Sequence, residues 1–233
     1  MILLALETAT STCGVAVLDD DTVVAEAHLR RPRVHAERLT PLVEDVLDHA
    51  DATPAALDAV AASMGPGSYT GLRIGVSTAK GWALSTDAAF VGVPTLAAYA
   101  AQLRPVAAPG DVVCALLDAR RDEVYAGAYR RTTDGLDEHA SPTALPVDDL
   151  PGWVGTVDGR LWLVGDGAPK SRAALGDAFT CTLIPADERP PSAGWVARCG
   201  RRQLAMHGPD DMATVEPLYV KDVHATPAPS PFD

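Results

Sequence analysis

Two spacings of apolar residues recur along the chain, and they predict different elements. Apolar runs bounded by polar turns predict five strands in the first half, at residues 2–6, 14–18, 22–27, 57–63 and 89–93. Between residues 35 and 50 the apolar positions fall three and four apart, which is the spacing of an amphipathic helix. A second helix is predicted to begin near Thr70, and a third to span residues 95–103. The first half is therefore expected to contain three strands followed by alternating helices and strands.

The second half repeats this order after a break. Residues 104–110 contain two prolines and a glycine and interrupt every periodicity, so we expect a domain boundary there. The remaining predicted segments are strands at 112–117, 123–129, 161–164 and 182–184, a helix at 193–206 and a proline- and aspartate-rich loop at 134–159. The expected fold class is α/β, with two RNase H-like domains in tandem at residues 1–103 and 104–222, the second one reduced, and a disordered tail at 223–233.

The segment 65–83 is the part around which the first half is organised. It opens with Gly-Pro-Gly, and Ser68 or Thr70 can cap the following helix by accepting a backbone N–H. Small residues recur every four positions along that helix: Gly71, Gly75, Ala79 and Ala83. A neighbour must approach this small face closely, because each glycine costs a helix about 1 kcal/mol relative to alanine and needs compensating contacts. On this pattern two interpretations are equally favoured. The helix packs inside the chain on its own sheet, or one of its faces packs on the sheet and the other on a partner protein.

Composition and charge narrow the function classes. The chain has 233 residues, of which 47% are hydrophobic, so it is long enough to bury a substantial core. A formal net charge of −12 argues against nucleic-acid binding by this chain alone. The arginine clusters at 30–33, 120–121 and 201–202 have no aromatic residues interleaved, and we interpret them as solvated surface or partner contacts.

The spacing of the cysteines bears on metal and redox motifs, and the apolar run at the start of the sequence bears on cellular location. The four cysteines lie far apart, at positions 13, 114, 181 and 199, so they form neither a zinc motif nor a Cys-x-x-Cys motif. The apolar run at 2–6 has no basic segment before it and ends at Glu7, which favours a strand over a signal peptide. No apolar run approaches the ~20 residues of a membrane helix. A cytoplasmic protein without a cofactor of its own is expected.

Four motifs of the chain resemble those of the bacterial TsaB (YeaZ) family. They lie at residues 4–10 (LALETAT), 65–75 (GPGSYTGLRIG), 118–125 (DARRDEVY) and 217–221 (PLYVK). The first two are typical of the wider group of TsaD and TsaB proteins, which belong to the actin-like ATPase superfold. The last two, with the short length of the chain, indicate TsaB. The resemblance runs from Met1 to about residue 221.

This resemblance implies a role in making N6-threonylcarbamoyladenosine in tRNAs that read codons beginning with A. The chain would be a non-catalytic partner of TsaD, acting as scaffold or activator alongside TsaE, and would meet tRNA only through the complex. It would pair through the small-faced helix with TsaD, or with itself when TsaD is absent. The expected interface residues are Gly71, Leu72, Ile74, Gly75, Thr78, Ala79, Trp82 and Ala83. A leucine at position 75 is then expected to abolish pairing while the domain stays folded.

The catalytic relative TsaD differs in a metal-binding His-x-x-x-His pair that follows the small-faced helix and the next strand. In this chain Thr95 and Tyr99 stand at those two positions, and neither is a good ligand for a transition metal. No two of the six histidines lie four residues apart. The chain is therefore expected to hold no catalytic metal and not to be an enzyme itself.

An ATP-binding kinase or ATPase of the actin-like superfold is the alternative function. The turn after the first strand offers candidate phosphate-binding residues: Glu7, Thr8, Thr10, Ser11 and Thr12. Actin-like ATPases commonly have aspartate at the Glu7 position, and the second hairpin at 118–121 carries cations in place of glycine and threonine. Only residues 165–167 remain as a relic of a glycine-rich adenosine loop. We therefore favour a vestigial turn whose hydroxyls bond to their own backbone.

Overall fold

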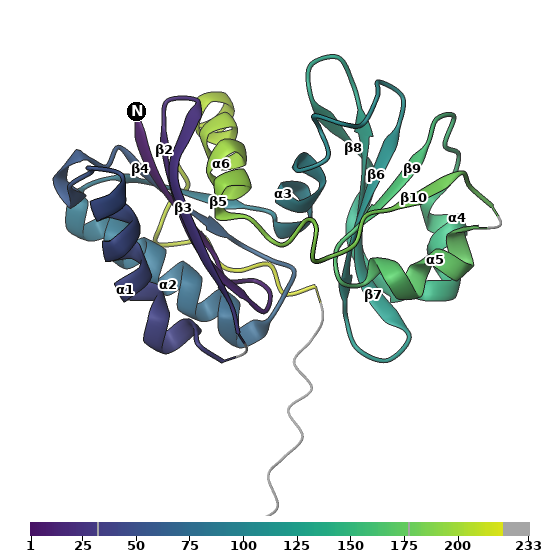
Figure 1. Cartoon of the computed structure of the whole chain (residues 1–233), viewed down its shortest axis with the longest axis horizontal. Coiled ribbons are helices and arrows are strands. Elements are labelled where there is room, and N and C mark those ends of the chain that lie inside the picture. Colours follow the sequence, from purple (N-terminus) through teal and green to yellow (C-terminus); the bar gives the residue numbers. More distant parts are fainter. Residues whose placement is uncertain (32, 177, 221–233) are drawn as a thin grey trace, which may run out of the picture.

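Two five-stranded mixed sheets stand side by side in the computed structural model, which describes residues 1–31, 33–176 and 178–220 (Figure 1). The first sheet has the strand order β3-β2-β1-β4-β5. Its strands are β1 (Ile2–Glu7), β2 (Thr12–Asp19), β3 (Thr22–Arg30), β4 (Ala59–Ser63) and β5 (Ala89–Val93). β1 pairs antiparallel with β2 and parallel with β4. The predicted meander and the two later strands are thus confirmed.

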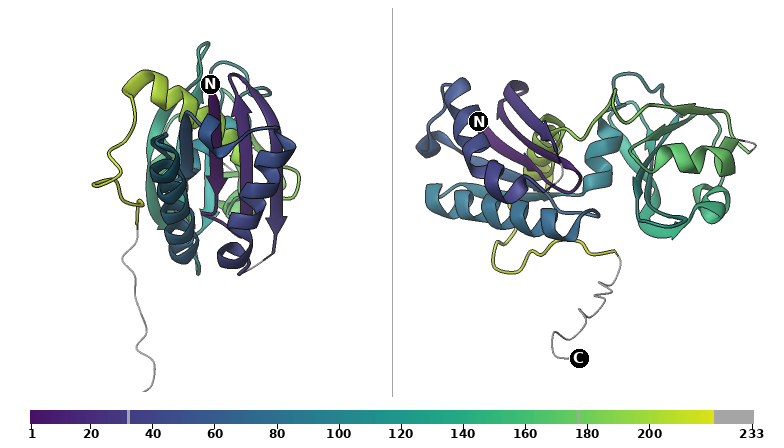
Figure 2. Two further views of the ribbon diagram at one scale, coloured as in Figure 1. Left: turned by 90° about the vertical axis from the view of Figure 1, so that its left-hand side faces the viewer. Right: turned by 60° about the horizontal axis from the view of Figure 1, so that its bottom comes forward.

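Different helices cover the two faces of the first sheet (Figures 1 and 2). α1 (His35–His49) and α2 (Tyr69–Thr86) pack on the face that carries Leu4. α6 (Ala193–His207) packs on the opposite face, which carries Leu3. Because successive side chains of a strand point to opposite faces, β1 is buried on both sides. The first sheet is therefore the central layer of three.

The second half has the same order of strands and helices as the first. Its elements are β6 (Val112–Asp118), β7 (Glu123–Arg131), β8 (Leu136–Pro146), α4 (Leu150–Val154), β9 (Leu161–Val164), α5 (Ala168–Gly176) and β10 (Cys181–Leu183). Each half also has a short 3-10 helix: η1 (Pro54–Ala56) before β4 and η2 (Val147–Asp149) before α4. The sheet order β10-β9-β6-β7-β8 is that of the first sheet read from the other edge. Its helices α4 and α5 have 5 and 9 residues, against 15 and 18 in α1 and α2. A second, reduced copy of the first unit is confirmed.

The loop predicted at 134–159 is wrong, because most of it is β8, η2 and α4. β8 pairs antiparallel with β7, with irregular register near Ala128. It is the edge strand of its sheet, where Pro142 is tolerated because one row of backbone groups has no partner strand. Its side chains are mostly half-buried or exposed, so the apolar alternation that marks a strand is weak. The strand is formed by pairing with β7, and the local sequence carries little signal for it.

The third helix of each half packs across the boundary between the halves. α3 (Thr95–Ala101) contributes Leu96 to a cluster with the second sheet. α6 follows the last strand of the second half but packs on the first sheet through Val196. We expected residues 104–222 to form one unit, whereas the structure assigns α6 to the layer on the first sheet. The apolar stripe of this helix was predictable, but nothing in it specifies which sheet it covers.

Helix α2 approaches the turn after β1 as closely as its glycines allow. A Cβ atom at Gly71 would overlap the backbone carbonyl oxygen of Thr8, and a Cβ atom at Gly75 would overlap the Thr8 side chain. The helix begins at Tyr69, one residue before the predicted start, and the Ser68 hydroxyl accepts the N–H of Gly71 at 3.2 Å. The small face is therefore required by a contact within the chain.

This contact corrects the expectation that the small face meets a partner. Five of the eight expected interface residues are buried in the single chain: Gly71, Leu72, Gly75, Ala79 and Ala83. The sizes of the side chains on a helix cannot tell an internal neighbour from an external one, since both need the same close approach. A leucine at position 75 has no space beside Thr8, so this substitution would disrupt the fold and could not test pairing.

We predict that Gly71→Ala lowers the free energy of unfolding by about 1–3 kcal/mol, because the new Cβ atom forces the Thr8 backbone away. Gly81→Ala is the matched control on the same helix, since a Cβ atom there has nothing within 4 Å. The control should gain up to about 1 kcal/mol from helix propensity. Urea denaturation of the two variants measures both values. Equal stabilities would contradict the close approach of α2 to the turn.

Candidate functional site

The outer face of α2 is exposed and largely uncharged. Ser77 and Gly81 are exposed, and Leu84 is 77% exposed, more than any other large apolar side chain of the described residues. Three expected interface residues border this face and are half-buried: Ile74, Thr78 and Trp82. We call Ile74, Ser77, Thr78, Gly81, Trp82 and Leu84 the outer strip. It does not include Lys80, whose ammonium is bound to the carbonyl oxygens of Met212 and Val215. Its small side chains would let another helix approach closely.

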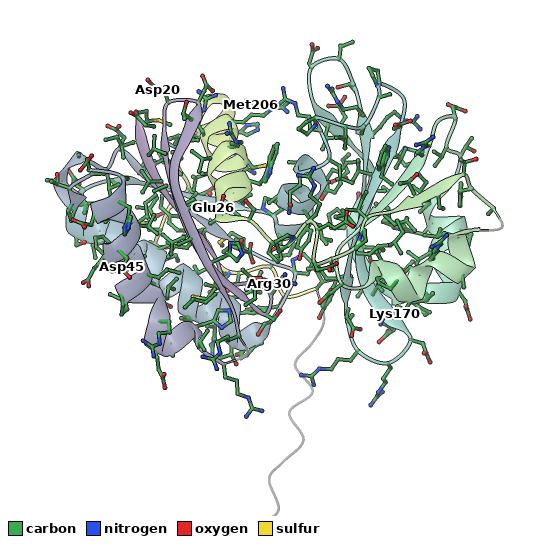
Figure 3. The ribbon with its side chains drawn as sticks, viewed as in Figure 1. Asp20, Glu26, Arg30, Asp45, Lys170 and Met206 are labelled. Atoms are coloured by element: carbon green, nitrogen blue, oxygen red, sulfur yellow. The ribbon has the colours of Figure 1, made fainter. Side chains whose placement is uncertain are left out.

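Helix α1 borders the outer strip with acidic residues. α1 and α2 lie side by side on the same face of the sheet (Figure 2). Glu44, Asp45 and Asp48 are exposed on α1, and Figure 3 shows Asp45 on the outside of the molecule. An uncharged strip beside an acidic helix gives any docking partner a defined electrostatic boundary.

The segment that follows α6 crosses the first half and lies along α2 (Figure 2). The Lys80 ammonium donates to the carbonyl oxygens of Met212 and Val215 at 2.8 and 2.7 Å. The N–H of Leu218 donates to the Met64 carbonyl oxygen at 2.6 Å. We call residues 210–219 the strap. Its anchor Lys80 was missed by sequence reasoning, because only the fold brings residues so distant in sequence together.

The strap ends on the first turn of α2. The rings of Tyr69 and Tyr219 have centroids 5.0 Å apart at an interplanar angle of 41°. The Arg73 guanidinium lies 4.8 Å from the centroid of the Tyr69 ring. Tyr219 belongs to the motif at 217–221, so the resemblance gave a signal for it, although its last residue lies outside the described part of the chain.

The turn after β1 is closed by its own side chains. Glu7 is 2% exposed, and its carboxylate accepts hydrogen bonds from the Ser63 hydroxyl and, at 2.9 Å, from the N–H of Ala9. The Thr10 hydroxyl accepts the N–H of Thr12 at 3.2 Å. Burial away from water raises the pKa of the Glu7 carboxyl to about 7, although both hydrogen bonds act to lower it.

Loop 65–68 and α2 cover this turn from outside. The N–H of Ser68 donates to the Ala9 carbonyl oxygen at 2.6 Å, and Thr8 is buried under the helix. The candidate phosphate-binding residues are thus brought together, but Glu7, Thr8 and Thr12 are buried, Thr10 is half-buried and only Ser11 is exposed. The hydroxyl and N–H groups that could cradle a phosphate are largely engaged within the chain or covered by it.

In the second half a lysine fills the corresponding hairpin. The Lys170 ammonium contacts the Asp118 carboxylate at 2.5 Å and donates to the carbonyl oxygens of Arg121 and Glu123 at 3.0 and 2.7 Å. The hydrogen bond from Lys170 is the main reason that the pKa of Asp118 is lowered. Figure 3 shows Lys170 at the end of the second sheet. A cation held by carbonyl oxygens occupies the place where a phosphate would need N–H donors.

The turn at 165–167 is the counterpart of the Gly-Pro-Gly turn in the second half. It connects β9 to α5 as residues 64–68 connect β4 to α2. A Cβ atom at Gly165 would overlap the Leu116 carbonyl oxygen. Asp166 accepts the N–H of Asp118 at 2.9 Å. The glycines are needed for packing of this turn on β6.

The recess between the halves is lined by an acidic group. It measures about 300 Å³, and Glu26, His28, Gln102 and Trp195 are among the residues that line it. The Glu26 carboxylate, labelled in Figure 3, accepts a hydrogen bond from the Ser192 hydroxyl at 2.8 Å and another from the Gly194 N–H at 3.1 Å. It therefore already supplies an acceptor to a free backbone N–H in the first turn of α6. Glu188 and Arg189 also line the recess, so it carries charged groups of both signs.

The positions that correspond to the metal ligands of TsaD are buried. Thr95 is 0% exposed and its hydroxyl accepts the Gly65 N–H at 3.0 Å, while Tyr99 is 4% exposed. The described residues contain no group of three or more His, Cys, Asp or Glu side chains placed to hold a metal ion. Among the helices of the described ranges, none has the length and apolar character needed to cross a membrane.

Comparisons with known proteins agree with the resemblance. The family model described as TsaD, tRNA N6-adenosine threonylcarbamoyltransferase, matches residues 29–158. The Escherichia coli (strain K12) protein TsaB, named a tRNA threonylcarbamoyladenosine biosynthesis protein, is 40% identical over 137 residues, which are 58% of each chain. The match thus spans about three fifths of the length of this curated relative.

Solved structures extend the likeness over the whole fold. YeaZ from Pseudomonas aeruginosa is 27% identical, with a TM-score of 0.79 over 94% of this chain and 99% of that chain. Component A of (R)-2-hydroxyglutaryl-CoA dehydratase from Acidaminococcus fermentans, at 10% identity and a TM-score of 0.51, shares the fold alone. The chain therefore belongs to the family that the TsaD model describes, and within it to the TsaB (YeaZ) proteins, with an α/β fold of the actin-like ATPase type.

Proposed function

We propose that the chain is a non-catalytic subunit in N6-threonylcarbamoyladenosine biosynthesis that pairs with TsaD through the outer strip of α2. The pathway is supported by the names of the curated relatives from Escherichia coli and Bacillus subtilis. The observation that carries the pairing is Leu84, 77% exposed beside Gly81 on an uncharged helix face. An exposed leucine on a smooth helix face gains by burial against a partner.

The outer strip replaces the small face as the proposed contact. Of the expected interface residues, Ile74, Thr78 and Trp82 remain partly accessible and belong to the strip. TsaE is proposed as a further member of the complex on the resemblance alone, and self-pairing through the same strip is proposed when TsaD is absent. The tRNA would be modified by the assembled complex.

The non-catalytic role is supported by the side chains that fill or cover the two hairpins. Glu7 and Thr8 lie under α2, and Lys170 fills the second hairpin with an ammonium group. An actin-like ATPase needs both hairpins open, because each supplies donors to the phosphates of one nucleotide. An ATPase role is therefore less well supported than a partner role.

We predict that Leu84→Asp weakens pairing with TsaD about tenfold or more, because it places a charge in a contact that buries an apolar side chain. Met206→Asp is the matched control, since Met206 is 59% exposed on α6, which covers the other face of the sheet. Both variants should melt like the wild-type chain. Analytical ultracentrifugation of mixtures with TsaD measures pairing. Unchanged pairing of Leu84→Asp, or equal loss in both variants, would show that the contact lies elsewhere.

We expect the purified chain to release no phosphate from ATP in the presence of Mg²⁺, and Glu7→Gln to behave identically. The buried Glu7 carboxylate has both oxygens in hydrogen bonds within the chain, so it is not available to organise a metal-bound nucleotide. A phosphate-release assay decides the matter. Turnover of about 1 s⁻¹ or faster that disappears in Glu7→Gln would establish the ATPase alternative.

Glu7 also predicts a pH dependence of stability. Its folded-state pKa of about 7 lies above the ordinary value of 4.5, so the folded chain binds this proton more tightly than the unfolded chain. Stability should therefore fall as pH rises from about 4.5 to about 7 and stay low above that range, by about 3 kcal/mol in total for this one group. Glu7→Gln should remove the decline. Urea denaturation at pH 5, 6, 7 and 8 measures it, and parallel pH curves for both proteins would refute the assignment.

A further inference from the structure

The connection from β3 to α1 carries three exposed arginines. Arg30 ends β3, and Arg31 and Arg33 precede α1. β3 runs parallel to β4, because β3 and β2, and β2 and β1, pair antiparallel while β1 and β4 pair parallel. The arginines therefore lie at the edge of the sheet where β4 ends, and Figure 3 shows Arg30 at this edge. None of the three forms an ion pair with a residue in the described ranges.

The start of α2 adds a fourth arginine and two aromatic rings at the same edge. Arg73 is exposed, has no ion pair within the described part of the chain, and packs on Tyr69. Tyr69 and Tyr219 are 38% and 40% exposed, so part of each ring faces solvent. We call these four arginines and two tyrosines the arginine edge. The interleaving of aromatic and basic groups that the sequence lacks is thus produced by the fold.

The spacing of these groups suits a chain of phosphates. β3 and β4 are separated by two strands, hence by about 14 Å at roughly 4.8 Å per strand spacing. Cations spread over such a distance cannot converge on one phosphate group. A polynucleotide carries a phosphate at every nucleotide, so it can contact all of them at once.

Part of the acidic charge of this chain, whose formal net charge is −12, lies away from the arginine edge. At the opposite end of the first sheet and of its helices lie Asp19, Asp20, Asp21, Asp51, Asp58 and Asp87. Within four residues of the members of the arginine edge, the exposed carboxylates of the described residues are Glu26, Glu37 and Glu216. Four arginines against these three carboxylates leave a small local positive charge that the net charge of the chain conceals. Local charge governs contacts at the ~8–10 Å range of ionic screening.

We propose that the arginine edge binds the phosphate backbone of RNA, with the exposed ring surfaces of Tyr69 and Tyr219 stacking on an unpaired base. The proposal rests on the proposed function in supplying tRNA as the RNA concerned. Because the arginine edge adjoins the start of α2, RNA bound there would lie beside the partner on the outer strip. The weak affinity of this chain alone for tRNA would then add to the affinity of the assembled complex for tRNA.

The test uses the full-length chain and a fluorescein-labelled tRNA transcript, with anisotropy measured from 25 to 150 mM salt. Wild-type chain should bind at 25 mM salt and lose most affinity at 150 mM. The double variant Arg31→Ser/Arg33→Ser should bind about tenfold more weakly at 25 mM, with the slope of log K against log salt reduced by about 1.5–2. The matched control Arg201→Ser/Arg202→Ser removes the same charge from α6, towards the end of the molecule where Figure 3 shows Met206, and should change affinity less than twofold.

Tyr219→Ala tests the stacking part and should weaken binding several-fold without changing the salt slope. No binding of wild-type chain at 25 mM salt, or equal weakening by the two arginine pairs, would overturn the proposal. An unchanged affinity of Tyr219→Ala would overturn the role of the rings. Pairing of each variant with TsaD is measured in parallel, so that loss of the RNA site with normal pairing, and loss of pairing with a normal RNA site, are told apart.

Discussion

The close contact between helix α2 and the turn after β1 is the constraint on which the first half depends. Gly71 and Gly75 bring the helix onto Thr8, and Gly67 brings the preceding loop onto Ala9. No residue with a Cβ atom fits at these places without moving the turn. The contact buries Glu7, closes the turn, and fixes which side of α2 faces outwards. The small face of α2, which resembles a partner interface in the sequence, is thereby buried inside the chain.

In the second half the corresponding hairpin is closed by different side chains. Gly165 and Gly167 bring the turn before α5 onto the backbone of Leu116 and Leu117. There the hairpin is held by the Lys170 ammonium, which satisfies two carbonyl oxygens and one carboxylate. One hairpin is closed by a buried carboxyl and hydroxyls, the other by a cation. Both arrangements use donors and acceptors of the chain where a nucleotide-binding relative would offer them to a ligand, which agrees with a fold retained for its surfaces.

Those surfaces divide the molecule electrostatically. Acidic residues of α1, among them Asp45, border the uncharged outer strip, while the arginines at the end of β3 and the start of α2 lie at the edge of the sheet (Figure 3). Lys80 ties the strap to the middle of α2, and the strap in turn places Tyr219 on Tyr69. A single helix therefore connects the buried turn, the proposed pairing surface and the proposed RNA site.

The sequence alone determined the order of the strands other than β8, the position of α2 and the family, because apolar periodicity, the cap at Ser68 and the glycine motif are local properties of the chain. It also indicated the closed turn, since hydroxyls beside free N–H groups satisfy them locally. Only the tertiary structure decided which face of α2 is inside, because small residues suit an internal and an external neighbour equally. It alone paired β8 with β7 and placed α6 on the first sheet. These outcomes depend on contacts between residues far apart in sequence, whose energies no local pattern records.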